Sequence, residues 1–437
     1  MPTSTREFDV IVAGAGVAGL SAARKIAESG LSTLVLEARN RVGGRIFTAH
    51  RSGEVVELGA EFVHGKPPEL WKVLKEAKLD TYELEGTDAC VEGGKLRRCG
   101  DLGRDGASIL DKLENWKGED ISFAEFLARH PMPDAARQRI IGYVEGFNAA
   151  DHTVIGVASL GRQQAAEESI EGDRAFRIRG GYSLLPQFLA QKVRDAGGEI
   201  ILGATVRHIE WQHRRITMEC TSAESSSTYV ARQAVIALPL GVLQSGAVHF
   251  TPVPQAVHEA ARLRMGNARR LTLIFHEKFW ADLPQHPFAD LSFLFSPASM
   301  PPVWWTAHPA QSCTLTGWVG GPRSQALAKL TEAELEEKAC EELAAIFSLK
   351  SASIRSLLIR CSTHSWQDDP FSLGAYSYVP AGAIDASSKM TIPAEDTLFF
   401  AGEHTDTTGH WGTVHAALRS GDRAASQVLE AQRADSM

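Results

Sequence analysis

The most regular pattern of apolar and polar positions lies near the N-terminus, between residues 9 and 45. Residues 10–12 form a short β-branched run, which predicts a buried parallel strand. Apolar residues then recur at helical spacing from residue 20 to Gly30, where the helix should end. A second apolar run at residues 34–36 ends at Glu37. This order of strand, helix and strand predicts an α/β fold.

The turn between the first strand and the helix carries Gly14, Gly16 and Gly19 in G-x-G-x-x-G spacing. The first glycine permits a tight turn, the second lets the backbone approach a pyrophosphate, and the third lets helix and strand pack closely. Glu37 lies 18 residues past Gly19, where a carboxylate binds the ribose hydroxyls of a dinucleotide. The pyrophosphate is expected at the helix N-terminus, where unpaired amides favour an anion.

Further along the chain, alternating or continuous apolar runs predict strands, and 3.6-residue periodicity predicts helices. Thr331 and Glu334 form a capping box that should begin one of these helices, and Pro239 should end a strand. Residues 121–195 look mainly helical. The predicted strands are 46–48, 55–58, 200–209, 234–238, 270–275, 291–295 and 313–319, and the predicted helices begin near residues 67, 184, 331 and 413.

Composition adds limits to this picture. A chain of 437 residues is long enough for two domains, and 44% hydrophobic with 22% charged residues is typical of a globular protein. The net charge is −8 and no basic block occurs, so we expect no nucleic-acid partner. An acidic surface slightly favours cationic substrates.

Six scattered cysteines show neither metal-ligand spacing nor a dense disulfide framework, so reduced thiols and no metal site are expected. The N-terminus lacks the apolar core of a signal peptide, and no run of about 18 apolar residues occurs. We therefore expect no membrane partner and a cytoplasmic location.

Motifs after the first glycine turn are similar to those of the flavin-containing amine oxidase family. Residues 41–45, Arg-Val-Gly-Gly-Arg, resemble the R-x-G-G-R sequence of two-motif flavoproteins. Residues 57–65 resemble the E-L-G-A-x-x-x-H-G segment of polyamine oxidases, and residues 397–405 with 412–421 resemble the family's last flavin motif. The resemblance extends over nearly the whole chain. It also covers residues 143–151, 234–241 and 315–321.

The resemblance implies one FAD and a two-domain fold, with a Rossmann-like dinucleotide-binding domain beside an α+β substrate domain. The FAD-binding domain would comprise residues 1–80, 197–245 and 391–437, and the substrate-binding domain residues 81–196 and 246–390. Arg45 would add a cation for the pyrophosphate. The implied cofactor-binding residues are Gly14, Gly16, Gly19, Glu37, Ala38, Arg39, Gly44, Arg45, Gly59, Ala60, Val206 (beside the adenine), Trp366, Gly402, Glu403, Thr413 and Val414.

The family's reaction moves a hydride equivalent from the carbon next to an amine to the flavin. The imine is then hydrolysed, and dioxygen reoxidises the flavin to give hydrogen peroxide. Trp366 and Tyr376 match positions that line the ring, although buried aromatics also occur as plain core residues. The implied catalytic residues are Arg270, Trp366, Tyr376 and His64, and the implied substrate-binding residues are Glu61, His64, Glu168, Tyr376 and Thr413.

Three departures from the family patterns narrow the prediction. Ala375 stands where monoamine oxidases carry the cysteine that bonds to the flavin, so FAD should be non-covalent. Thr413 replaces their second cage tyrosine, as in polyamine oxidases and demethylases. Arg270 replaces a lysine that reaches the flavin through a water in many members, and arginine is not a proton acceptor.

The prediction is a polyamine oxidase that acts on spermine or spermidine, with an amine and dioxygen as its small-molecule partners. The carboxylates Glu167, Glu168 and Glu171 form either a solvated helix face or a cation-attracting rim. The alternatives are a monoamine oxidase, an L-amino acid oxidase that uses Arg177 or Arg179, or a methyl-lysine demethylase, for which 437 residues leave little room. A non-catalytic flavin-binding protein would not need the aromatic pair. The oligomeric state is not predicted.

Overall fold

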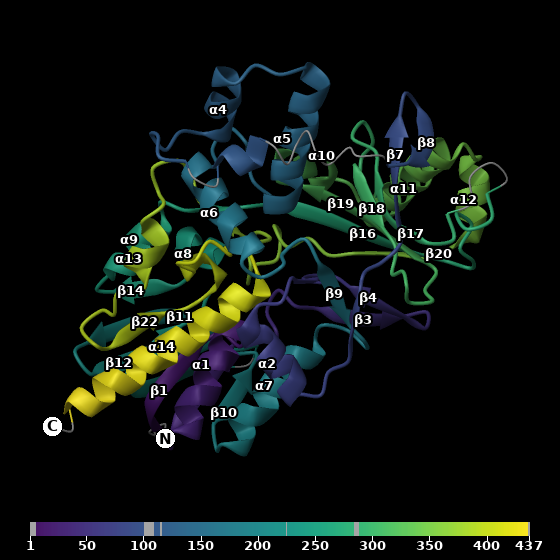
Figure 1. Ribbon diagram of the computed structural model, residues 1–437. Coiled ribbons are helices and arrows are strands. Elements are labelled where there is room, and N and C mark those ends of the chain that lie inside the picture. The colour runs from purple at the N-terminus through teal and green to yellow at the C-terminus, as the bar shows by residue number, and fades with distance from the viewer. Residues whose placement is uncertain (1–5, 100–108, 114–115, 224, 284–287, 436–437) are drawn as a thin grey trace.

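The computed structural model describes residues 6–99, 109–113, 116–223, 225–283 and 288–435. Two large β-sheets lie in different parts of the molecule, with helices packed against each (Figure 1). In Figure 1, the sheet that contains β1 lies below the sheet that contains β16. This arrangement is consistent with the prediction of a nucleotide-binding part and a second part.

The first sheet has eight strands in the order β10-β2-β1-β13-β12-β11-β14, with β22 paired to β13. The β10, β2, β1, β13 and β22 strands pair in parallel, whereas β12 is antiparallel to both of its neighbours. The strands are β1 (Glu7–Ala13), β2 (Thr33–Glu37), β10 (Glu199–Leu202), β11 (Thr205–Gln212), β12 (Arg215–Thr221), β13 (Ser226–Ile236), β14 (His249–Thr251) and β22 (Leu398–Phe400).

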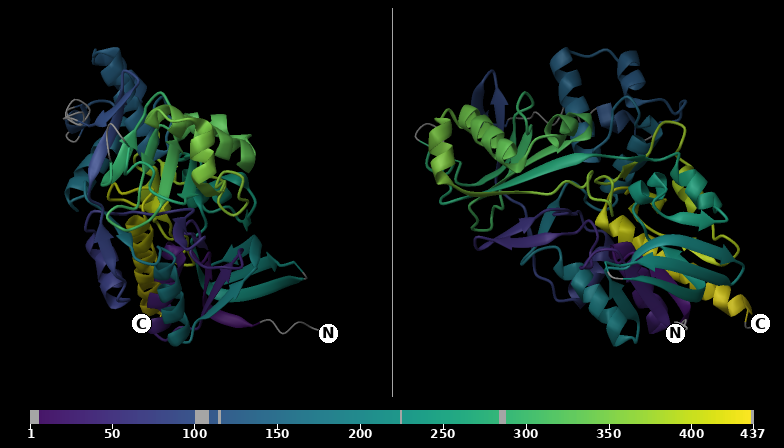
Figure 2. Two further views of the ribbon diagram at one scale, coloured as in Figure 1. Left: turned by 90° about the vertical axis from the view of Figure 1, so that its right-hand side faces the viewer. Right: turned by 180° about the vertical axis from the view of Figure 1, so that it is seen from behind.

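Alternate residues of β1 face two separate cores, because the parallel part of this sheet is covered on both faces. Val10 and Val12 pack with the first set of helices, and Ile11 and Ala13 pack with the second set. The first set is α1 (Val17–Glu28), α2 (Pro68–Glu76), α7 (Leu184–Asp195) and α14 (Val414–Asp435). The second set is α8 (Leu240–Ser245), α9 (Gln255–Ala260) and α13 (Ala386–Met390). Figures 1 and 2 show α14 lying along α1.

The second sheet has seven strands in the order β20-β16-β19-β18-β17-β7-β8. Leu271 and Leu273 of β16 pack against α11 (Glu332–Phe347) and α12 (Ser351–Leu357). The alternate residues Arg270 and Thr272 therefore lie on the opposite face. The strands are β7 (Thr87–Glu92), β8 (Lys95–Arg98), β16 (Ala268–Phe275), β17 (Leu291–Phe295), β18 (Val303–Trp305), β19 (Thr314–Gly320) and β20 (Leu358–Thr363).

A helical layer lies beside this second sheet and packs around Phe123 and Phe126. It consists of α4 (Phe123–Arg129), α5 (Asp134–Asn148) and α6 (Val157–Glu168). Smaller elements connect these layers. They are the hairpin β3 (Thr48–Arg51) and β4 (Glu54–Glu57), the sheet β5 (Val63–His64), β9 (Ala175–Ile178) and β6 (Thr81–Glu83), the pair β15 (Arg264–Met265) and β21 (Ser377–Tyr378), α10 (Gln325–Ala328), and the 3-10 segments η1 (Gly321–Ser324) and η2 (Glu403–Thr405).

Most predicted elements are present, including the capping box at Thr331 and Glu334 and the end of β13 before Pro239. The prediction of one strand over residues 200–209 is wrong. Gly203 has a φ of +71° and separates β10 from β11. In the strand order, β10 is one edge of the sheet and β11 lies next to the other edge. The domain boundaries stay a prediction, although α7 packs against α1 and β14 pairs with β11 from outside the predicted FAD-binding segments.

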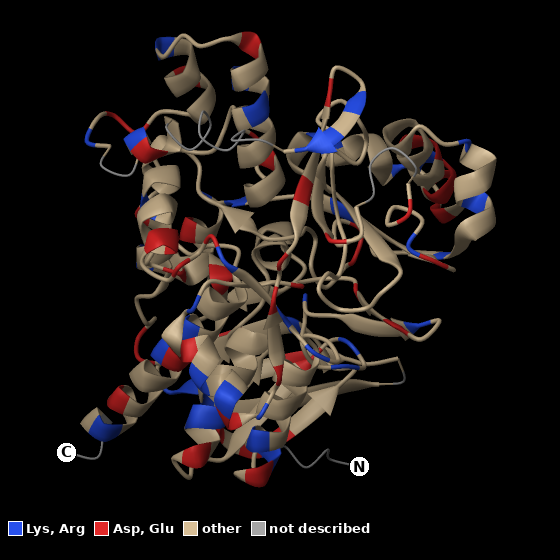
Figure 3. Cartoon of the chain, turned by 45° about the vertical axis from the view of Figure 1, so that its right-hand side comes forward, with Lys and Arg blue, Asp and Glu red and all other residues tan. Residues whose placement is uncertain are grey.

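The expectation of six reduced cysteines is wrong, because Cys90 and Cys99 form a disulfide. The β7–β8 hairpin brings their Cα atoms to 5.2 Å, a contact that scattered sequence spacing did not suggest. The cytoplasmic location loses the support of reduced thiols and stays a prediction. Within the described ranges, no helix has the length and apolar character needed to cross a membrane. Acidic and basic residues are interspersed along the chain in Figure 3.

Candidate active site

A cavity of about 1610 Å³ is lined by residues of both large sheets and of the helical layer. All the predicted site residues line this cavity except Gly19 and Glu168. The predicted nucleotide-binding and amine-binding residues therefore share one continuous space. One end of the cavity lies beside the first glycine turn, and the other lies beside Trp366 and Tyr376.

The glycine turn has the geometry that the motif predicts. Gly14 has a φ of +106°, and a Cβ on it would lie 2.8 Å from the Ala237 carbonyl oxygen. A Cβ on Gly19 would lie 1.9 Å from the carbonyl oxygen of Gly14, so this glycine allows α1 to pack closely. A Cβ on Gly16 would meet no atom within 4 Å. Gly16 thus leaves open the space next to the N-terminus of α1, where a pyrophosphate is expected.

Glu37 is buried at the end of β2, where its carboxylate accepts hydrogen bonds from the Ala15 and Arg39 amides, both at 2.8 Å. These two contacts orient the carboxylate at the cavity wall. The Arg39 guanidinium pairs with Asp369 at 2.7 Å. Burial raises the pKa of Asp369, but the hydrogen bond with His364 and the contact with Arg39 hold it below its usual value. Arg39 therefore has a structural partner in addition to its predicted place beside the cofactor.

An ion pair between Arg45 and Glu403 connects the N-terminal flavin motifs to the last flavin motif, residues 397–405. Arg45 Nη1 donates to Glu403 Oε1 and to the Ala375 carbonyl oxygen, both at 2.9 Å. Glu403 also accepts from Ser377 Oγ at 2.5 Å and from the Gly412 amide at 3.0 Å. Burial alone would raise the pKa of Glu403, but the Arg45 charge and these hydrogen bonds hold it below its usual value.

The first turn of α14 also reaches the cavity. Thr413 Oγ1 accepts from the Ala416 amide at 3.2 Å and donates to the His410 carbonyl oxygen at 2.7 Å, so it caps the helix. Thr413 and Val414 line the cavity. Two helices, α1 and α14, therefore begin at the cavity wall. Together with the open space at Gly16, the Glu37 acid and the Arg45 cation, they fit the two ends of FAD.

Trp366 and Tyr376 are both held by hydrogen bonds to backbone carbonyl groups. Trp366 Nε1 donates to Leu58 O at 2.8 Å, and Tyr376 Oη donates to Phe147 O at 2.7 Å. A Cβ on Gly59 would lie 3.0 Å from the Trp366 ring, so the small residues at 59 and 60 keep this wall narrow. Burial raises the pKa of Tyr376, which keeps the phenol neutral.

Arg270 is buried between the second sheet and the loop after β4. Its Nη1 donates to Glu57 O at 2.9 Å and to Gly59 O at 2.7 Å, and its Nη2 pairs with Glu61. Its guanidinium also lies over the Trp305 ring, 5.3 Å from the centroid. Burial lowers the pKa of Arg270, but an arginine remains charged at neutral pH.

Glu61 does not present a free carboxylate to the cavity. It pairs with Arg177 as well as Arg270, and Trp305 Nε1 donates to it at 3.2 Å. Its role as a substrate ligand stays a prediction, and these contacts do not favour it. The neighbouring Glu57 is half-buried, and the loss of water around its carboxyl group raises its pKa to about 7. Two guanidinium groups, those of Arg177 and Arg270, therefore lie beside two carboxyl groups, of which Glu61 is paired with both arginines and Glu57 is partly protonated at neutral pH.

His64 lies at the cavity between the rings of Phe62 and Phe147, with centroid separations of 5.9 and 5.6 Å. Burial lowers the pKa of His64 to about 4. The imidazole is neutral at pH 7, so one ring nitrogen is available to accept a hydrogen bond.

The three predicted carboxylates at the end of α6 and just after it, Glu167, Glu168 and Glu171, lie in different environments. Glu168 is exposed and does not line the cavity, so the structure does not support its predicted contact with substrate. Glu171 is exposed and pairs with Arg174 at 2.6 Å. Glu167 turns inward beside Gly172, and burial raises its pKa to about 7. The rim interpretation is not favoured for Glu168, because this exposed residue does not line the cavity.

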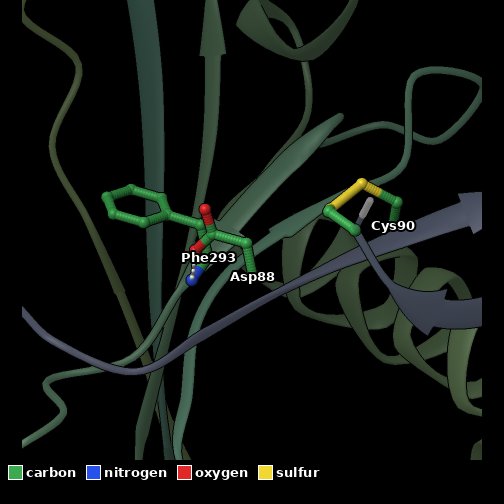
Figure 4. Close-up of a disulfide and its surroundings, with 4 residues drawn as sticks. Asp88, Cys90 and Phe293 are labelled. Atoms are coloured by element: carbon green, nitrogen blue, oxygen red, sulfur yellow. Dashed lines mark hydrogen bonds between the residues drawn. A yellow bond between two sulfur atoms is a disulfide. The ribbon is translucent and has the colours of Figure 1, made fainter. Parts of the chain in front are cut away.

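Several residues at the cavity were not predicted from sequence. Trp305, Trp318, Phe293 and Asp88 all lie on one face of the second sheet. Figure 4 shows Asp88 between Phe293 and the disulfide. Alternation along β7 and β17 was the available signal, but the pairing of these strands was not known.

One group of possible metal ligands lies at the edge of the cavity. Glu145, Asp151 and His152 place one ligand atom each within 4.8 Å of one another. His152 Nδ1 and Glu145 Oε1 lie 2.6 Å apart, so these two groups already satisfy each other. The expected absence of a metal stays a prediction.

Comparisons with known proteins agree with this geometry. The model of the flavin-containing amine oxidoreductase family matches residues 17–139 and 92–429. Polyamine oxidase 2 of Arabidopsis thaliana is 28% identical over 469 residues, covering 98% of this chain and 90% of that protein. Flavin-containing amine oxidase B of Sus scrofa is 25% identical over 468 residues, covering 97% and 86%. A solved putrescine oxidase with bound putrescine has a TM-score of 0.83 at 21% identity, covering 98% of this chain and 100% of that one, so the fold is shared.

Proposed function

Because the chain belongs to the family of flavin-containing amine oxidoreductases and is therefore a FAD-dependent amine oxidase, we propose that its substrates are polyamines of the spermine and spermidine kind. The overall reaction would convert the amine, water and dioxygen into an aldehyde, a shorter amine and hydrogen peroxide. Bound FAD supplies the acceptor for a hydride equivalent from the carbon next to the nitrogen.

The observation that carries the polyamine proposal is the charge on the cavity wall beyond the aromatic pair. Asp88, Glu92 and Asp173 line the cavity and have no ion pair within the described ranges. Arg323, which also lines the cavity, donates to the carbonyl oxygens of Pro297 and Ser299, and Arg139 has a partner as well. Unpaired carboxylates away from the reacting carbon suit a substrate with several ammonium groups.

The residues at the reacting end have separate roles in this proposal. Trp366 and Tyr376 form the apolar walls that exclude water and orient the amine. His64, as a neutral imidazole, would accept a hydrogen bond from an N–H of the substrate. Arg270 keeps its charge and holds the backbone of the Gly59 loop, so it takes no proton.

The residues at positions 375, 177 and 179 bear on how FAD is attached and on the amino acid oxidase alternative. Ala375 lines the cavity and has no thiol, which favours FAD bound without a covalent bond. The L-amino acid alternative is less favoured, because Arg177 is paired with Glu61 and Arg179 pairs with Asp80 at 2.8 Å among exposed residues. Neither arginine is free to bind a substrate carboxylate.

Steady-state hydrogen peroxide release tests the proposal across spermine, spermidine, benzylamine, phenethylamine and L-amino acids. Spermine or spermidine is expected to have the highest kcat/KM. Raised salt should increase the KM for these polyamines more than for benzylamine, because exposed charge pairs are screened over about 8–10 Å. A monoamine or an amino acid with the highest kcat/KM would contradict the polyamine assignment and leave the amine oxidase fold in place.

A further inference from the structure

One row of cross-strand neighbours extends over the cavity face of the second sheet. Directly paired residues on five strands are Arg270 on β16, Trp318 on β19, Val303 on β18, Phe295 on β17 and Cys90 on β7. Residues opposite one another in a sheet lie on the same face, and all five line the cavity. This row forms one wall that begins at the Gly59 loop and ends at the disulfide.

A carboxylate is placed at the far end of this wall. Asp88 precedes Cys90 by two residues, so both side chains lie on the cavity face of β7. The Phe293 amide donates to Asp88 Oδ1 at 3.3 Å, which holds the carboxylate beside the Phe293 backbone (Figure 4). Phe293 also lines the cavity. The Cys90–Cys99 bond joins β7 to the end of β8 and holds this part of the wall together.

Asp88 is the carboxylate there whose charge is least compensated. Glu92 is the cross-strand partner of Lys95, which places an opposite charge beside it. Arg97 is the partner of Cys90 but does not line the cavity, and Arg98 reaches Thr87 and Asp290 instead. Asp88 is exposed and has no ion pair among the described residues, and the loss of surrounding water raises its pKa.

We infer that Asp88 binds the remote ammonium group of a long amine substrate, with the Phe293 ring as a second contact for the cation. This inference rests on the proposed function and identifies a residue that selects substrates by length. A carboxylate beside an aromatic face is a suitable site for an alkylammonium group, because both attract the charge. Such a remote contact orients the reacting end of the substrate.

The length of the wall indicates which amines reach Asp88. Neighbouring strands are about 4.8 Å apart, so the four steps from β16 to β7 span about 19 Å. An extended chain advances about 1.2 Å per single bond, as an extended peptide does. Release of a shorter amine requires oxidation beside a secondary nitrogen of spermine, which leaves about nine bonds, or about 11 Å, to the far terminal nitrogen. Putrescine offers about five bonds, or about 6 Å, between its two nitrogens. Spermine therefore extends further along this wall toward Asp88 than putrescine does, so a contact with Asp88 would distinguish the two amines by length.

The test compares Asp88→Asn with the unmodified holoenzyme on spermine, putrescine and hexylamine. Asparagine keeps an oxygen that accepts from the Phe293 amide, so the fold should be retained. We expect kcat/KM for spermine to fall about tenfold through a higher KM, and the values for putrescine and hexylamine to stay within about twofold. Asp88→Glu should keep most of the spermine activity because it keeps the charge. Glu85→Gln, the same charge change at an exposed residue outside the cavity, is the matched control and should change none of the three.

Two outcomes would overturn this inference while the proposed function stands. In the first, the unmodified enzyme prefers spermine and Asp88→Asn keeps that preference. In the second, the substitution weakens all three amines equally, which would indicate a structural role for Asp88. An unmodified enzyme that prefers hexylamine would overturn the proposed function together with the inference.

Discussion

Arg270 has contacts that a lysine could reproduce only in part. Its two nitrogens reach Glu57 O, Gly59 O and the Glu61 carboxylate, and a lysine ammonium would keep the charge but not the fork. Because neither residue needs to accept a proton, we expect Arg270→Lys to keep anaerobic flavin reduction within about tenfold, a change of about 1.4 kcal/mol in the barrier. Rapid mixing with substrate under anaerobic conditions measures this rate.

Arg177→Lys is the matched control for that substitution, since it changes the other guanidinium on Glu61. A loss of several orders of magnitude in Arg270→Lys alone would show that the Arg270 guanidinium takes part in the chemistry itself.

The burial of His404 should make the free energy of unfolding decrease in acid. His404 is fully buried, and within the described part of the chain neither ring nitrogen has a hydrogen-bond partner. Burial lowers its pKa to about 4, below the value of about 6.5 in the unfolded chain. The unfolded state therefore binds the proton first, so this contribution is complete above pH 6.5 and decreases as the pH falls toward 4.

Between pH 7.5 and pH 5 the loss attributable to His404 should be about 2 kcal/mol of unfolding free energy. Urea unfolding at the two pH values measures it. His404→Leu should lose less stability over this interval than the unmodified protein, and His50→Leu, at an exposed histidine, should lose as much as the unmodified protein. Equal losses in all three would contradict the assignment.

Single residues could be predicted from sequence where one local motif determines their place. The turn at Gly14, the acid at Glu37 and the arginine at position 45 belong to such motifs. Arg177 was considered only as a carboxylate ligand in the amino acid oxidase alternative, and Trp305 was not predicted as a site residue. Each of them meets Glu61 from a different part of the chain. Ionic contacts of this kind depend on tertiary packing, which a motif does not contain.

At the scale of elements, the packing of α14 against α1 depends on a small residue. A Cβ on Gly421 would lie 2.1 Å from the carbonyl oxygen of Ala18, so the helices touch at this point. Gly421→Ala should destabilise the fold by about 1–3 kcal/mol, because the helices must separate. Differential scanning calorimetry and urea unfolding measure the change.

Gly142→Ala in α5 is the matched substitution, since a Cβ there meets no atom within 4 Å. It should be neutral or stabilise by up to about 1 kcal/mol through helix propensity. Equal effects of the two substitutions would show that the close contact at Ala18 does not limit the packing.

Elements with a strong local pattern were predicted well, and their pairing was not. The runs of β16, β17 and β19 were recognised as strands from their apolar residues. Their order in the sheet, and therefore the wall from Arg270 to Cys90, follows from long-range pairing. The Cys90–Cys99 disulfide was missed for the same reason, since the eight residues between the two cysteines are mostly polar or glycine and did not indicate how the chain pairs there.

At the scale of the whole molecule, the cofactor half of the cavity is assembled from distant segments. Gly14 and Glu37 come from the first part of the chain, and Glu403 and Val414 come from the last. We expect FAD to be held by these contacts alone, since Ala375 offers no thiol. Acid or heat denaturation should release free yellow cofactor into the supernatant. Flavin that remains with the precipitated protein would contradict this expectation.

Removal of FAD should also lower the melting temperature, because a ligand that binds only the folded state stabilises it by mass action. Added FAD should restore the original value, with a shift that grows with cofactor concentration. The sequence motifs indicated that FAD binds, but the shape of a cavity lined by both sheets could not be read from them, since it depends on how the two sheets face each other.

The distance in sequence between Gly14 and Glu403 has a consequence in time. A ribosome adds about 5–20 residues per second, so roughly 20–80 s pass between the synthesis of the first motif and that of the last. During this interval β13 lacks its partner β22, and Arg45 lacks the carboxylate of Glu403. A growing chain thus cannot offer a complete binding site. Complete flavin binding is therefore a late event in the synthesis of the protein.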